Sequence, residues 1–151
     1  MHTAEDMARK LNAALRNAGY NTYYLESRKK PIPMSMEAVE VSLGIPNVFP
    51  VSADGDVLVQ VTEDMAKVTT DLIRVPPSRA ADVVITCNGI NAMISMTRFY
   101  VQPDELVVVA DHDFSYSNDA FIEQIIKYLP MYRHDVRQAH SFIQATINGQ
   151  L

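Results

Sequence analysis

The stretch that most constrains the fold is residues 76–147, which predicts a helix, a tight hairpin and a long helix in that order. The predicted hairpin strands are 97–101 and 106–110, and the Pro103-Asp104 pair between them is typical of a type I turn. The second strand is apolar on both faces, which predicts a central or doubly covered place in a sheet. This order of elements indicates an α+β fold.

The two helices around the hairpin each contain one residue that disfavours a helix. The first is predicted over 78–95 and contains Gly89, which costs about 1 kcal/mol relative to alanine unless close packing requires it. We therefore expect a close packing contact at Gly89. The second is predicted over 117–147, where Pro130 interrupts a sustained apolar stripe and predicts a kink or a split, at a cost of about 3 kcal/mol.

The N-terminal half predicts further elements and one internal boundary. Thr3 can cap a helix over 3–18. Further on, the pattern predicts a strand at 20–25, a short helix at 35–43, and strands at 48–52, 57–61 and 68–75. Charge and two prolines at 27–33 mark the boundary. We predict that residues 1–30 are a helical appendage and that residues 31–151 form the main domain.

Composition limits the partners and the compartment. The net charge is −5, which disfavours nucleic acid as a partner, because binding phosphates needs clustered lysine and arginine. No apolar run approaches the roughly 20 residues of a membrane span, so no membrane partner is expected. The single cysteine cannot form an internal disulfide, and the N-terminus lacks a signal-peptide pattern. We expect a cytoplasmic protein.

No motif assigns a catalytic, cofactor-binding or metal-binding residue. The chain has no phosphate-binding glycine loop and no nucleophile motif. The cluster Asp111-His112-Asp113 would divide across the two faces of a strand, so a solvated strand end is the favoured interpretation. His134 and His140 are six residues apart, a spacing that does not pair metal ligands on a helix. Cys87 is expected to be a buried, inert thiol.

Two groups of residues near the hairpin are candidates for contacts. Asn88 and Asn91 share a helix face, either to contact a ligand or to tie the helix to the hairpin, and we favour the tie. Methionine-rich apolar surfaces adapt to varied partners. The proposed partner-binding residues are Met93, Met96, Phe99 and Tyr100.

The segment CNGINAMISMTRFYVQPDELVVVADHDFSYSNDAFIEQIIKYL, residues 87–129, resembles the YbjN family, which has the fold of type III secretion chaperones. The segment MSMEAVEVSLGIP resembles its first helix. Two departures are Ile90, near a tryptophan that is frequent in relatives, and Ser115-Tyr116-Ser117 in place of a loop glycine. The resemblance implies an antiparallel sheet of about five strands flanked by helices, in the order α-βββ-α-ββ-α, with an extra N-terminal helix. It also implies a non-enzymatic protein that dimerises.

Three functional hypotheses follow. The first is a non-enzymatic, chaperone-like regulatory protein that forms a homodimer and binds another polypeptide without a cofactor. The second is a small enzyme or a ligand- or metal-binding protein that uses Asp111, His112, Asp113 and His140. The third is a structural module in which residues 1–30 dock onto a neighbour.

Overall fold

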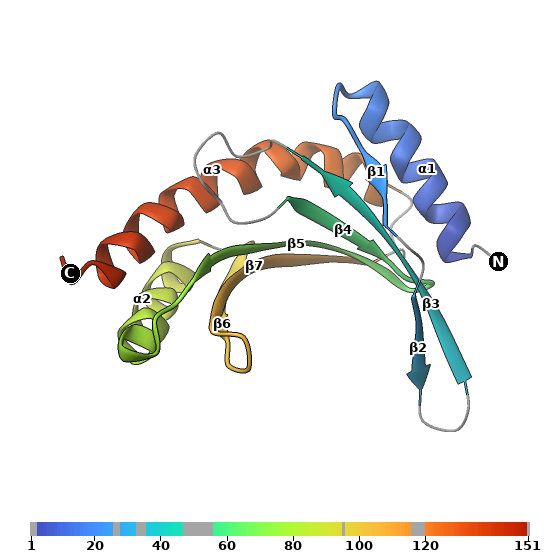
Figure 1. Ribbon diagram of the computed structural model, residues 1–151. Coiled ribbons are helices and arrows are strands. Elements are labelled where there is room, and N and C mark those ends of the chain that lie inside the picture. Colours follow the sequence, from blue (N-terminus) through green and yellow to red (C-terminus); the bar gives the residue numbers. More distant parts are fainter. Residues whose placement is uncertain are drawn as a thin grey trace. The chain divides into compact units, whose positions relative to one another are not determined.

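The computed structural model describes residues 3–25, 28–32, 36–46, 56–94, 96–115 and 120–150. In these residues, three α-helices and one short 3-10 helix accompany a seven-stranded sheet (Figure 1). The helices are α1 (Ala4–Asn17), η1 (Pro77–Arg79), α2 (Ala80–Met93) and α3 (Phe121–Ile147). The strands are β1 (Tyr23–Tyr24), β2 (Arg28–Ile32), β3 (Met36–Ile45), β4 (Val57–Val61), β5 (Met65–Arg74), β6 (Arg98–Gln102) and β7 (Val107–Ser115).

The strand order is β1-β3-β4-β5-β7-β6, and β2 also pairs with β3. The α+β class and the antiparallel sheet predicted from the sequence are confirmed, although the sheet has more strands than the predicted five or so. The strand predicted at 48–52 and the predicted start of the last helix, 117–119, lie outside the described residues.

One predicted element is wrong. The segment predicted as a helix over 35–43 forms strand β3 instead. Val41, Leu43 and Ile45 alternate along β3 and are all buried, so the period of two outweighs the weaker helical spacing. Gly44 lies between them because the ring of Tyr23 occupies the place where a side chain would be.

The chain divides into two compact units, each assembled from separate stretches. The first contains Met1–Pro46, Val57–Val68 and Asp113–Tyr128, and the second contains Asn47–Asp56, Thr69–His112 and Leu129–Leu151. The strands β5 and β7 and the helix α3 therefore each contribute residues to both units.

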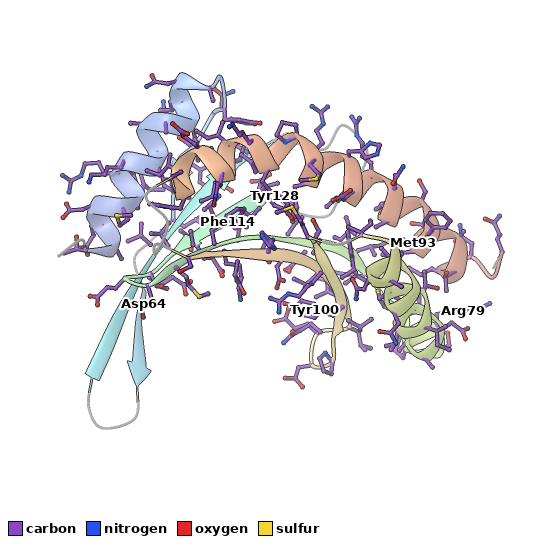
Figure 2. All side chains as sticks on the ribbon, turned by 180° about the vertical axis from the view of Figure 1, so that it is seen from behind. Asp64, Arg79, Met93, Tyr100, Phe114 and Tyr128 are labelled. Carbon is purple, nitrogen blue, oxygen red and sulfur yellow. The ribbon has the colours of Figure 1, made fainter. Side chains whose placement is uncertain are left out.

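In the first unit, α1 packs on β3 and β4. The side-chain oxygen of Thr3 accepts a hydrogen bond from the N–H of Asp6 at 3.1 Å, which confirms the predicted cap. The buried face of α1 consists of Ala4, Met7, Ala8, Leu11 and Leu15. Phe114 of β7 and Tyr128 of α3 complete this core with an edge-to-face contact, their ring centroids 5.3 Å apart (Figure 2).

In the second unit, α3 is tied to the sheet by a buried tyrosine. The Tyr132 hydroxyl lies 2.8 Å from the side-chain oxygen of Thr70 on β5 and donates to the carbonyl of Ala110 on β7 at 2.8 Å. Residues 107–110 of β7 are all buried, as their apolar sequence predicts. Pro130 lies on the exposed side of α3, and the helix continues through it without a split.

Candidate partner-binding surface

Helix α2 begins after Pro76 and Pro77, which set an extended chain and then the first turn. It ends at Met93, because Ile94 adopts an extended conformation. The side chains of Val83, Cys87 and Ile90 face the interior and are buried. This inner face anchors the helix beside η1 and β6.

The opposite side of α2 is also mainly apolar but is exposed. We call it the outer face of α2, and it consists of Ala81, Val84, Ile85, Asn88, Gly89, Ala92 and Met93. The exposed fractions are 69% for Ile85 and 71% for Met93. The outer face also includes one charged side chain, Asp82, which is exposed one turn before Ile85 and forms a 3.4 Å ion pair with Arg79. A helix that is apolar on all sides is typical of a buried position, so this face is suited to being covered.

The four residues proposed from the sequence lie in different environments. Met93 is exposed on α2, and Met96 is half-buried after it. On β6, Tyr100 is 37% exposed, whereas Phe99 is only 1% exposed. Phe99 and Tyr100 are neighbours on a strand, so their side chains point to opposite faces of the sheet. Figure 2 shows Met93 on α2 and Tyr100 on β6, both in the second unit.

The sequence interpretation missed Ile85 as a candidate surface residue. Val84, which is 43% exposed on the same helix, was not identified either. The available signal was the amount of apolar sequence: α2 has more apolar residues than one buried stripe can use. A second error concerns Gly89. Among the described residues, nothing lies within 4 Å of a Cβ atom added there, so these residues do not provide the predicted packing contact.

Asn91 connects α2 to β6. Its side-chain amide donates to the carbonyl of Phe99 at 2.8 Å and accepts from the N–H of Phe99 at 2.8 Å. The side chain thus pairs with β6 as a neighbouring strand would. The predicted tie between helix and hairpin is confirmed for Asn91, while Asn88 is exposed on the outer face of α2.

The Asp111 carboxylate is buried, so the predicted solvated strand end is wrong for this residue. It is 1% exposed and forms a 2.8 Å ion pair with Arg98. The Tyr100 hydroxyl donates to its other oxygen at 2.7 Å. Arg98 is directly opposite Asp111 in the β6–β7 register, so the cluster ties two strands together. This arrangement leaves the carboxylate engaged in structural contacts.

The remaining titratable candidates do not converge. Among the described residues, no group of three or more histidine, cysteine, aspartate and glutamate side chains could hold a metal ion. His112 and Asp113 are half-buried on β7, His134 is exposed and His140 is half-buried on α3. Burial raises the pKa of Cys87 to about 11, which keeps the thiol protonated and unreactive at neutral pH. The expectation of a buried thiol is confirmed.

Comparison with known proteins supports the fold. No protein-family model matches this chain. No curated protein matches it. Among solved structures, the chain is similar to the crystal structure of "YbjN, a putative transcription regulator from E. coli", with a TM-score of 0.65 and 14% identity. The similarity covers 94% of this chain and 93% of that chain, so the YbjN-like fold predicted from the sequence is confirmed.

Among the described helices, none combines the length and the apolar character that a membrane span needs.

Proposed function

We propose that this chain is a cytoplasmic, non-enzymatic regulatory protein that forms a homodimer and binds another polypeptide through the outer face of α2. The supporting observation is the exposure of Ile85 and Met93 on a helix whose inner face is already buried. The regulatory role named for YbjN agrees with this proposal, since the two proteins share a fold.

The size and chemistry of the outer face of α2 favour a reversible apolar contact. A 14-residue helix is about 21 Å long, so one of its faces offers less than the roughly 800 Å² per partner of a standard stable interface. Small side chains at Ala81, Gly89 and Ala92 allow a close approach around Ile85. We expect the partner to present a mainly apolar helix or strand, because a charge placed against Ile85, Ala92 and Met93 would lose hydration there.

Site-specific photocrosslinking in the native host would test this proposal. A photoreactive amino acid replaces Ile85 in one variant and Tyr24 in a control, because Tyr24 is 52% exposed on β1, away from α2 in the sequence and in the other unit. We expect one discrete adduct from position 85 and none from position 24. The adduct partner, once purified, should bind the wild-type chain about tenfold or more tightly than Ile85→Glu. An adduct of twice the chain mass, or none, would contradict the proposal.

The enzyme hypothesis receives no support from Asp111. Both of its carboxylate oxygens are in contacts with Arg98 and Tyr100 that join β6 to β7. His112 and Asp113 lie on β7 and not on the outer face of α2. Substituting them should leave the binding of the partner unchanged, which the same purified pair would show.

A further inference from the structure

Strand β3 has an open backbone edge over its N-terminal half. β2 pairs with β3 from Glu40 to Met36, whereas β4 pairs with β3 only from Val41 to Ile45. Beyond β4 the chain turns back, with the N–H of Thr62 donating to the carbonyl of Met65 at 2.9 Å. Among the described residues, no strand therefore pairs with 36–40 on the side where β4 lies. Figure 1 shows β2 and this part of β3 extending together as a two-stranded ribbon.

The register shows which backbone groups point to the open side. Leu25 donates its N–H to the carbonyl of Ser42 at 2.8 Å, so even-numbered residues of β3 direct their backbone groups toward β1 and β2. From the pair Tyr24–Leu43 to the pair Arg28–Glu40, the chain advances four residues on the β1–β2 side but three on β3. The additional residue therefore belongs to the β1–β2 side, and the alternation of β3 continues without interruption. The N–H and carbonyl groups of Glu37 and Val39 consequently face the open side.

The two edges of the ribbon differ in their protection. β2 contains Pro31 and two lysines, residues that natural proteins place on edge strands to prevent further pairing. The β3 segment 36–40 contains no proline or lysine, and its only charged residues are Glu37 and Glu40. An isolated two-stranded ribbon is marginal in water, so the unprotected edge of β3 is the one that gains from another strand.

We infer that this edge pairs with the same segment of a second copy, antiparallel about a two-fold axis at Ala38. This rests on the homodimer proposed above and assigns its interface. The arrangement places Glu37 of each copy opposite Val39 of the other, and both positions supply outward backbone groups. A register centred on Glu37 would oppose two like charges, which is destabilising. A register centred on Val39 would need the outward groups of Val41, which already pairs with Val61 of β4. The register centred on Ala38 is therefore the one that fits.

Disulfide trapping provides the direct test. At the axis, the two Ala38 residues form a non-hydrogen-bonded pair with Cα atoms about 4.5 Å apart, which is within disulfide range. Ala38→Cys should give a disulfide-linked dimer under mild oxidation. Lys30→Cys is the matched control, because Lys30 pairs with Ala38 from β2 and lies one strand further from the axis. The native Cys87 is buried and should not contribute.

A proline at the open edge gives an independent measurement. Val39→Pro removes an outward N–H without removing a bond to β2, and Val39→Thr is the control that keeps both the N–H and the branched side chain. Sedimentation should show self-association weakened about tenfold or more by the proline alone. If Lys30→Cys crosslinks as readily as Ala38→Cys, or if Val39→Pro associates like the wild type, this interface is wrong. If either of these results is found and the wild-type chain still dimerises, the proposed homodimer stands and only its interface is wrong. If the wild-type chain is a monomer, both the homodimer and this interface are wrong.

Discussion

Asn91 is the residue whose side chain takes the place of a strand neighbour at the edge of β6. Its two hydrogen bonds satisfy both the N–H and the carbonyl of Phe99, whose side chain is in the core. Asn91→Ala should lower the free energy of unfolding by about 2–3 kcal/mol, because it leaves two backbone groups unpaired. Urea denaturation measures this change. Asn88→Ala is the control on the same helix, and it should be neutral or slightly stabilising.

Gly89 shows what a sequence pattern cannot determine about a single residue. A glycine inside a helix indicates either a close packing neighbour or a loss of helix stability that no packing contact offsets. The sequence contains nothing that distinguishes the two. The space around Gly89 is open, so Gly89→Ala should raise the free energy of unfolding by about 1 kcal/mol.

Gly149 provides the contrasting control for that measurement. Its φ is +73°, and an added Cβ would lie 2.7 Å from the guanidinium of Arg79. Gly149→Ala should destabilise the protein by about 1 kcal/mol or more. Equal effects of the two substitutions in thermal or urea denaturation would contradict this account.

At the scale of elements, long periodic segments could be predicted and short ones could not. The stripe of α3 repeats over many turns, and α1 has a capping residue at Thr3, so both helices were found. In β3, Met36, Val39 and Leu43 fit a helix, while Val39, Val41, Leu43 and Ile45 fit a strand. Only pairing with β1, β2 and β4 decides between them, and this pairing depends on distant sequence. The open edge of β3 was therefore out of reach of sequence analysis, whereas Met93 was found because methionines cluster near α2.

Pro130 tests how an element tolerates a local defect. It lacks the N–H that would bond to the carbonyl of Ile126, yet α3 continues through it with its core face intact. Pro130→Ala should raise the free energy of unfolding by about 2 kcal/mol, because the exposed site can accept alanine and regain the bond. Pro77→Ala is the control, since Pro77 begins η1, where a missing donor costs little. A decrease in stability with Pro130→Ala would show that α3 depends on the proline's geometry.

At the scale of the whole molecule, each compact unit combines stretches that are separated in the sequence. The first unit combines three separate stretches, so a boundary read from local composition need not match a folding boundary. The division into residues 1–30 and 31–151 is still a prediction. The packing of α1 on β3 and β4 provides the means to test it.

Removing residues 1–30 would uncover the buried apolar residues of β3 and β4 beneath α1 and delete β1. Met7, Leu11 and Leu15 are each at most 5% exposed, and burying such side chains stabilises by about 2 kcal/mol each. Their sum is comparable to the whole stability of a typical domain, so we expect the chain of residues 31–151 not to fold cooperatively. Circular dichroism during urea titration measures this, with full-length Leu11→Ala as a milder variant that should lose about 2–5 kcal/mol. A cooperative transition in the shortened chain, at near wild-type stability, would establish residues 1–30 as a separable appendage.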